Sequence, residues 1–298
     1  MFPLPTIVMY VFQMEDCNCT LKGVLLGLLG LTVLLYLINN AARFYIRCTL
    51  LYLTVFFNAM LTLITGIPSS IFGQAAYVGF LHMRIVAWWT GIKVERRGYD
   101  EVFSKQTGPC VVLCNHQSAV DLMVMAYAFP PRGTVMMKKS LIYIPLFNIA
   151  MWLCNCITVD RFNKEKAQEA LQRSSDKITN KKLKIWVFPE GTRNGGGGML
   201  PFKKGAFNIA VNAQIPIVPV VASSYTPFFS VKDKRFDSDG EVIIQVMEPI
   251  PTQGLTPDDV VALADSTRGK MIEVFDRLTA ENNARMEAKR SGVKEKSQ

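Results

Sequence analysis

One short segment of this chain combines a histidine and a carboxylate at a spacing suited to proton transfer. His116 lies just after the apolar run 109–114, and Asp121 follows five residues later. A neutral imidazole can take a proton from an alcohol when a carboxylate fixes its tautomer and stabilises the imidazolium that forms. We therefore interpret His116 as a general base and Asp121 as its orienting partner. The alternative is a polar turn at a helix start that carries no chemistry.

A second polar turn, from Glu190 to Arg193, follows the apolar run 184–188. Gly191 allows a tight turn, Thr192 offers a hydroxyl, and the planar guanidinium of Arg193 fits phosphate oxygens two at a time. The turn predicts a binding site for an anionic substrate. The alternative is a structural turn with a surface ion pair between Glu190 and Arg193.

Two further cations and several missing motifs narrow the chemistry. Arg161 ends the run 156–161 and Lys139 follows a predicted strand, so both are lesser candidates for binding an anion. The chain has no Walker or G-x-G-x-x-G phosphate loop, no G-x-S-x-G elbow and no H-E-x-x-H zinc motif. A base with no marked protein nucleophile beside it indicates that the substrate supplies the attacking hydroxyl.

Short β-branched runs alternate with helical stretches from residue 108 onward, and these elements must position the two turns. The six predicted strands are the runs 109–114, 134–137, 156–159, 184–188, 216–221 and 242–246. Helices are predicted at 165–178 and 205–213, and a late helix begins at Thr256 and carries an apolar stripe to Leu278. The alternation predicts an α/β fold, a mixed sheet flanked by helices.

The first 83 residues contain only five charges, whereas the remaining 215 contain 52. The uncharged stretch 23–42 is long enough for a helix of about 30 Å, the thickness of a hydrocarbon core. Acidic residues precede it, so we interpret it as a retained anchor and not as a cleavable signal peptide. A second helix at 48–65 and an interfacial helix at 71–83 complete a predicted N-terminal membrane-embedded segment. Full spans and a shallow hairpin in one leaflet both fit this pattern.

These patterns divide the chain into three parts. We expect membrane-anchoring helices at 1–83, one α/β domain at 84–280 and a solvated, charged tail at 281–298. Lys294 and Lys296 in the tail have a spacing that resembles the retrieval signal of endoplasmic reticulum membrane proteins.

The composition excludes several classes of protein. Half of the residues are apolar and 19% are charged, which excludes a disordered chain. Seven cysteines without a C-x-x-C pair are interpreted as free thiols in a reducing compartment, and we expect no structural zinc. The net charge is +9, but the sequence shows no aromatic platform for stacking on bases and no helix suited to base recognition. We therefore expect no nucleic-acid partner.

Six blocks of residues, in order along the chain, resemble the glycerolipid acyltransferase family. They are N-H-Q-S-A-V-D (115–121), K-K-S-L-I-Y-I-P-L-F-N (138–148), I-T-V-D-R (157–161), F-P-E-G-T-R (188–193), L-P-F-K-K-G-A-F (200–207) and I-P-I-V-P-V (215–220). The pattern is closest to the eukaryotic 1-acylglycerol-3-phosphate acyltransferases of the alpha and beta type. The resemblance covers about residues 85–280, and six ordered blocks are far more specific than any one of them.

The resemblance implies transfer of a fatty acyl group from acyl-CoA to the sn-2 hydroxyl of lysophosphatidate, which yields phosphatidate and CoA. It implies catalytic roles for His116 and Asp121, and no cofactor or metal, with acyl-CoA as co-substrate. The E-G-T-R block would bind the acyl acceptor, with Arg161 and Lys139 as lesser substrate-site candidates. With such lipid substrates, the apolar N-terminal helices predict a phospholipid bilayer as partner, and the spacing of Lys294 and Lys296 predicts an integral protein of the endoplasmic reticulum membrane.

Three other functions fit parts of the pattern. The acceptor could be glycerol 3-phosphate or a lysophospholipid with a larger head group. A membrane lipid-binding protein without catalysis could keep the same fold. A Cys-dependent S-acyltransferase could use Cys114, which lies two residues before His116.

Overall fold

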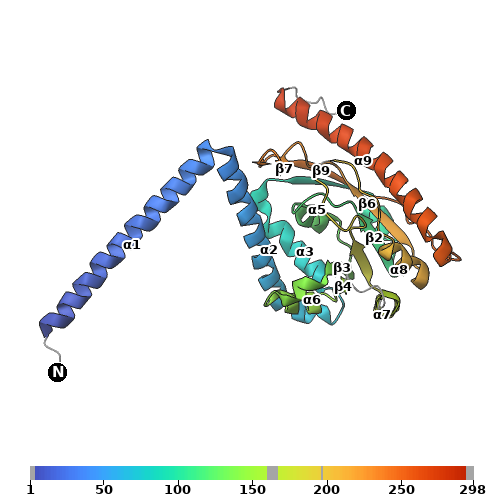
Figure 1. The fold of residues 1–298 in the computed structure, drawn as a ribbon, viewed down its shortest axis with the longest axis horizontal. Helices are drawn as coiled ribbons and strands as arrows, with labels where there is room; N and C mark the ends of the chain where they lie inside the picture. The colour runs from blue at the N-terminus through green and yellow to red at the C-terminus, as the bar shows by residue number, and fades with distance from the viewer. Residues whose placement is uncertain (1–3, 160–166, 196, 293–298) are drawn as a thin grey trace.

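The computed structural model describes residues 4–159, 167–195 and 197–292, with a seven-stranded mixed sheet at its centre (Figure 1). The strand order is β1-β9-β6-β2-β5-β3-β4. The strands are β1 (Lys93–Arg97), β2 (Cys110–Cys114), β3 (Gly133–Lys138), β4 (Ile157–Val159), β5 (Lys184–Val187), β6 (Ile217–Ala222) and β9 (Glu241–Val246), and a separate pair is β7 (Phe229–Ser230) with β8 (Arg235–Phe236). All six predicted strands are confirmed. The pattern missed β1 because this edge strand is mostly charged.

Five neighbouring strands of the sheet run parallel. β6, β2, β5, β3 and β4 are joined by parallel pairs, whereas β9 is antiparallel to β6 and β1 runs parallel to β9. The carboxyl ends of parallel strands share one edge of a sheet. Because β2 and β5 are adjacent, the loops that carry His116 and Glu190 meet at that edge.

Helices cover both faces of the sheet (Figure 1). One face packs against α2 (Asn40–Ser70), α3 (Ala75–Val86) and α5 (Asp121–Ala128), and the other against α7 (Ala167–Asn180), α8 (Gly205–Ala213) and α9 (Val260–Arg290). Two short helices are α4 (Tyr99–Phe103) and α6 (Phe147–Leu153). Alternate residues of β2 enter two separate buried clusters, Val112 on one face and Val111 on the other. A strand buried on both faces must be apolar throughout, as β2 is.

Two helices, α1 (Leu4–Ile38) and α2, are each long and apolar enough to cross a membrane. The predicted helix at 23–42 is confirmed as far as Ile38, but its predicted end is wrong because the chain bends at Asn39. The Asn39 side chain accepts a hydrogen bond from the Ala42 amide, and Arg43 donates to two carbonyl oxygens at the end of α1. An asparagine at this position starts a new helix by capping its first amides.

The helices between residues 40 and 86 share a core with the sheet. Phe44, Leu51 and Met83 belong to the same buried cluster as Val112 and Val242. The expected boundary at residue 84 therefore does not separate two cores. Residues 75–86 form α3, which packs between α2 and α5, and the interfacial position expected for 71–83 stays a prediction.

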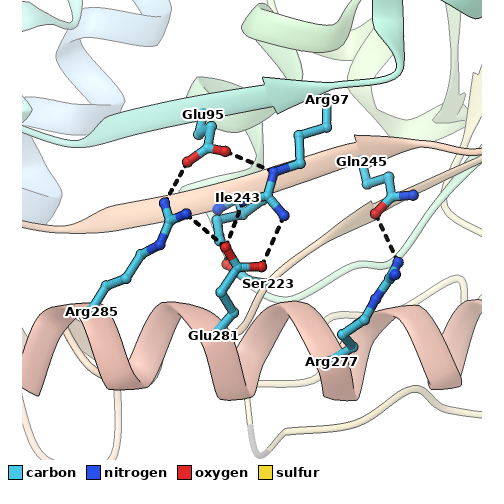
Figure 2. A network of polar contacts seen from close by, with 8 residues as sticks. All are labelled: Glu95, Arg97, Ser223, Ile243, Gln245, Arg277, Glu281 and Arg285. Atoms are coloured by element: carbon cyan, nitrogen blue, oxygen red, sulfur yellow. Dashed lines mark hydrogen bonds and ion pairs between the residues drawn. The ribbon is translucent and has the colours of Figure 1, made fainter. Parts of the chain in front are cut away.

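The solvated tail expected from residue 281 is wrong as far as Arg290. α9 continues to that residue, and Met286 is buried. Figure 2 shows why: Glu281 and Arg285 of α9 face Glu95 and Arg97 of β1, with Arg97 bound to Glu281 at 2.6 Å. Glu281 and Arg285, which resembled charges of a solvated tail, are ion-pair partners of an edge strand. Lys294 and Lys296 lie outside the described residues.

Candidate active site

The loop after β2 holds His116 against Asp121, the first residue of α5. The His116 Nδ1 atom lies 2.6 Å from Asp121 Oδ2, and the amides of Gln117 and Ser118 donate to the same oxygen at 3.0 and 2.9 Å. Since a carboxylate oxygen accepts, the neutral tautomer that fits this contact has its proton on Nδ1 and its lone pair on Nε2. The side chain of Asp121 is only 4% exposed, whereas that of His116 is 19% exposed. The arrangement is that of an oriented base with one open nitrogen.

Neighbouring elements fix the position of this loop. Asn115 exchanges two hydrogen bonds of 2.9 Å with the backbone of Ala222 at the end of β6. The Gln117 amide group donates to the Ala222 carbonyl as well. The imidazole of His116 stacks on the ring of Phe188, with centroids 4.1 Å apart. The His116 loop is therefore held from β6 on one side and from β5 on the other.

Glu190 is buried directly behind His116, with 2% of its surface exposed. Its Oε1 accepts a hydrogen bond from the His116 amide at 2.8 Å, and its Oε2 accepts one from the Leu200 amide at 2.9 Å. Burial raises the pKa of Glu190 above its usual value, while these hydrogen bonds oppose the shift. The carboxylate thus ties the His116 loop to the loop that begins near residue 199.

Gly191 occupies a backbone conformation that only glycine adopts readily, with φ of 67°. A Cβ atom there would lie 2.7 Å from the Lys203 Nζ atom. The Lys203 ammonium therefore lies over the turn, beside the exposed residues Thr192 and Arg193. The turn presents two cations to solvent, and one of them comes from outside the motif.

His116 and Arg193 line one cavity of about 270 Å³. Their segments are joined directly, because the Asn194 amide donates to the His116 carbonyl at 2.8 Å. Away from these two residues, the cavity runs between the sheet and the helices α2, α3 and α6. Its apolar lining includes Val55, Ala59, Ala76, Phe80, Met83, Leu122, Val135, Met137, Leu141, Phe147, Ala150 and Met151.

Comparisons with known proteins align with the residues of this site and with most of the chain around them. Residues 93–223 match the Acyltransferase family model. The chain is 42% identical to acl-2 of Caenorhabditis elegans over 268 residues, which cover 90% of this chain and 94% of that protein. It is 36% identical to human 1-acyl-sn-glycerol-3-phosphate acyltransferase beta over 82% of this chain and 88% of that one. This chain belongs to the 1-acyl-sn-glycerol-3-phosphate acyltransferase family.

A solved structure confirms the fold of this acyltransferase. The crystal structure of the 1-acyl-sn-glycerophosphate acyltransferase PlsC from Thermotoga maritima aligns with a TM-score of 0.57 and 22% identity. The alignment covers 76% of this chain and 97% of that one. The expected α/β class, a mixed sheet flanked by helices, is therefore correct.

The fold of the acyltransferase brings most of the predicted site residues together. His116, Asp121 and Arg193 line the cavity. Glu190 lies behind His116, and Gly191 is in the same turn as Arg193. Thr192 is exposed on the same turn. Lys139 begins the 3-10 turn η2 (Lys139–Tyr143) after β3 and is not among the described residues that line the cavity. Arg161 lies outside the described residues.

Sequence reasoning missed three residues of this site. Phe188 stacks on the base but follows an apolar strand, so its pattern indicated only packing. Lys203 resembled an ordinary surface lysine until the fold placed it over Gly191. Tyr225 is buried, its amide donates to the Gln117 side chain, and no local pattern marks it. Burial and the nearby Asp121 carboxylate raise the pKa of Tyr225 well above its usual value, which keeps a neutral hydroxyl beside Asp121.

Proposed function

We propose that this acyltransferase moves a fatty acyl group from acyl-CoA to the sn-2 hydroxyl of lysophosphatidate, forming phosphatidate and CoA. One observation carries the proposal: a single cavity is lined by the oriented base His116 and by the cation Arg193, and it continues as an apolar channel. The printed name of the human relative supports the acceptor, a 1-acyl-sn-glycerol 3-phosphate. The reaction needs no cofactor, because acyl-CoA is consumed as a substrate.

The proposed chemical step uses the His116–Asp121 pair. His116 Nε2 removes the proton of the acceptor hydroxyl as its oxygen forms a bond to the thioester carbonyl carbon. The carbon–sulfur bond then breaks, and the imidazolium returns the proton to the departing CoA sulfur. Asp121 stabilises the imidazolium between these events. A positioned base of this kind contributes about 10²- to 10⁴-fold to a rate.

Cations of the E-G-T-R turn hold the acceptor phosphate in this proposal. The guanidinium of Arg193 binds two phosphate oxygens, and the Lys203 ammonium adds a second charge from across Gly191. Glu190 acts as a positioning residue, since both of its oxygens accept backbone hydrogens. Arg161 and Lys139 remain lesser candidates for the same phosphate or for those of CoA.

The apolar part of the cavity suits a fatty acyl chain. Hydrocarbon buried there leaves water, which is favourable in proportion to the apolar area removed. The helices α1 and α2 support attachment to a phospholipid bilayer, where both lipid substrates reside. We further propose an integral protein of the endoplasmic reticulum membrane.

Assays of CoA release test the proposal. Detergent-purified protein is given one acyl-CoA and, in turn, lysophosphatidate, glycerol 3-phosphate and a lysophospholipid with a larger head group. We expect lysophosphatidate to have the highest kcat/KM. Preference for another acceptor would change the substrate assignment, and no CoA release with any acceptor would favour a lipid-binding protein without catalysis.

The Cys-dependent alternative has its own test. Cys114 is buried, and burial raises the pKa of its thiol well above the usual value, which opposes formation of a thiolate. We expect no acyl-enzyme that hydroxylamine cleaves. Trapping of such a species on Cys114 would replace the acceptor hydroxyl as the group that attacks the donor.

A further inference from the structure

The segment made of η2 and α6 has two apolar faces. Its inner face lines the cavity through Leu141, Phe147, Ala150 and Met151. Its outer face is exposed, with Tyr143 at 79% and Trp152 at 77%. The other exposed apolar residues of this face are Ile142, Ile144, Leu146 and Ile149. One short segment therefore separates the cavity from the outside.

The same end of the molecule carries a second exposed apolar segment. Figure 1 places α6 at the end of α2 that is remote from α1. The two helices touch, because a Cβ at Gly66 would lie 3.6 Å from the Leu153 Cδ1 atom. At this end of α2 and in the following turn, the exposed large apolar residues are Ile64, Ile67, Ile71 and Phe72. The outer face of the η2–α6 segment thus continues the apolar surface of a helix that is suited to lipid.

A cationic hollow flanks this apolar surface. It has a volume of about 530 Å³ and is lined by Trp152 of α6, Ser70 of α2, Lys177 of α7 and Lys181, which directly follows α7. The Lys177 ammonium donates to the Cys156 carbonyl, and the Lys181 ammonium donates to the Asn155 side chain. Neither lysine contacts a carboxylate among the residues that the structure describes. Burial lowers the pKa of Lys177, as expected for a cation that lacks a negative partner.

We infer that the η2–α6 segment and the end of α2 form a membrane-contact surface that inserts into an anionic phospholipid leaflet. The exposed aliphatic residues enter the acyl region, and Tyr143 and Trp152 lie at the boundary with the head groups, where aromatic residues concentrate. Lys177 and Lys181 then lie at the level of the lipid phosphates. Given the proposed function, the segment is the wall past which lipid chains reach the cavity without crossing water.

Two features favour a lipid leaflet over a protein partner. The surface is continuous with α2, which is apolar along its outward face over its full length, as its exposed residues Tyr45, Leu53, Phe57 and Ile64 indicate. The cations flank the apolar residues and do not lie among them, which is the arrangement of an interfacial helix on an anionic membrane.

Fluorescence quenching locates Trp152 directly. The full chain is reconstituted in phosphatidylcholine vesicles that contain phosphatidylserine, and the emission of Trp152 is taken as the difference between the protein and its Trp152→Phe variant. We expect quenching by lipids brominated on the acyl chains and protection from aqueous iodide. Quenching by iodide without quenching by brominated lipid would overturn the inference. This readout does not depend on activity, so it stands even if the proposed reaction is wrong.

Activity in two lipid environments tests the role of the surface. For the double variant Ile149→Ser, Trp152→Ser, we expect about a tenfold lower rate with lysophosphatidate in vesicles, since two apolar side chains no longer enter the leaflet. The rate in detergent micelles should be unchanged. Val261→Ser is the matched control, because Val261 is similarly exposed but lies on α9, on the opposite face of the sheet. Equal losses in vesicles and micelles, or no loss in vesicles, would contradict the inference.

The anionic part of the inference has a separate test. Lys177→Gln and Lys181→Gln should each reduce the stimulation by phosphatidylserine about fivefold, since a cation near an anionic surface contributes about that factor. Stimulation that both variants retain in full would remove these lysines from the contact. A wild-type protein inactive with every acceptor, yet with Trp152 quenched by brominated lipid, would contradict the proposed function alone.

Discussion

The imidazole of His116 and the ring of Phe188 are stacked, with centroids 4.1 Å apart and an interplanar angle of 20°. His116 follows β2 and Phe188 follows β5, so the contact joins two loops that are 72 positions apart in the sequence. Asp121 binds one edge of the imidazole, and Phe188 supports its face. In the proposed reaction, a base that must meet a lipid hydroxyl at one angle gains from both restraints.

Loss of the Phe188 ring should therefore affect turnover more than substrate binding. We expect Phe188→Ala to lower kcat about tenfold with little change in KM, because the imidazole can rotate away from the productive angle. Phe188→Tyr keeps the stacked ring and should retain most activity. Steady-state kinetics with lysophosphatidate distinguish the two. A large rise in KM with unchanged kcat would assign Phe188 to the substrate pocket instead.

Removal of the base should abolish turnover and spare binding. We expect His116→Ala to lower kcat by about 10²- to 10⁴-fold. Asp121→Asn should cause a smaller loss, because the imidazole remains but its imidazolium is stabilised less. Binding of radiolabelled lysophosphatidate provides the control. The Kd of each variant should stay within twofold of the wild-type value, a difference of about 0.4 kcal/mol in binding free energy. Wild-type turnover in His116→Ala would disprove the assigned base.

The cations of the turn should act on the acceptor and not on the donor. We expect Arg193→Ala to raise the KM for lysophosphatidate by about tenfold or more, since a hydrogen bond to a charged group is worth about 1.5–3 kcal/mol. Lys203→Ala should have a similar but smaller effect. Arg193→Lys should recover part of the loss because it restores charge without the planar fork. A rise confined to the KM for acyl-CoA would assign the turn to the CoA phosphates.

Gly191 should tolerate no side chain. An alanine at a φ of 67° costs roughly 1–2 kcal/mol, and its Cβ would also meet the Lys203 side chain. We expect Gly191→Ala to lower both Tm and activity. Gly269→Ala is the control, since this glycine lies within α9 with open space around it. That variant should raise stability by about 0.5–1 kcal/mol, and a fall in its Tm would contradict this explanation.

The ion pairs between α9 and β1 should stabilise the fold only where the carboxylates are ionised. A hydrogen bond from the Arg97 guanidinium lowers the pKa of Glu281 below its usual 4.5. Its stabilising effect is therefore present above pH 4.5 and is lost as the pH falls through the lower pKa of the folded state. About a third of the Glu281 side chain is exposed, so we expect Glu281→Gln to cost less than about 1 kcal/mol at pH 7.

Chemical denaturation at several pH values checks this expectation. The difference between wild type and Glu281→Gln should shrink as the solution is made acidic. Glu273→Gln, an exposed change on the same helix, should have no effect at any pH. A difference that persists unchanged at low pH would indicate a packing effect of Glu281 and not a charge effect.

Local patterns predicted most elements of this protein. Each of the six predicted strands is present, and the predicted helix 205–213 matches α8. The late helix begins as predicted, with a capping box between Thr256 and Asp259. Periodicity and capping depend on residues within a few positions of one another. Both signals can therefore be recognised from the sequence without knowledge of the tertiary structure.

Two errors at the ends of the chain had non-local causes. Residues 281–290 are helical because Glu281 and Arg285 find partners on β1, over 180 positions earlier. The helices α2 and α3 are part of the core because the sheet offers them an apolar face. Neither the partner nor the face is visible from the local pattern of charge.

The amino-acid sequence by itself determined which residues are suited to the proposed chemistry: a histidine with a carboxylate five positions away, and a glycine turn that ends in an arginine. Only the tertiary structure decided how they work together. The adjacency of β2 and β5 made Glu190 a buried support for His116, placed Phe188 under the imidazole and brought Lys203 over Gly191. Strand order is set by packing over the whole chain, so contacts between loops of different strands have no local signature.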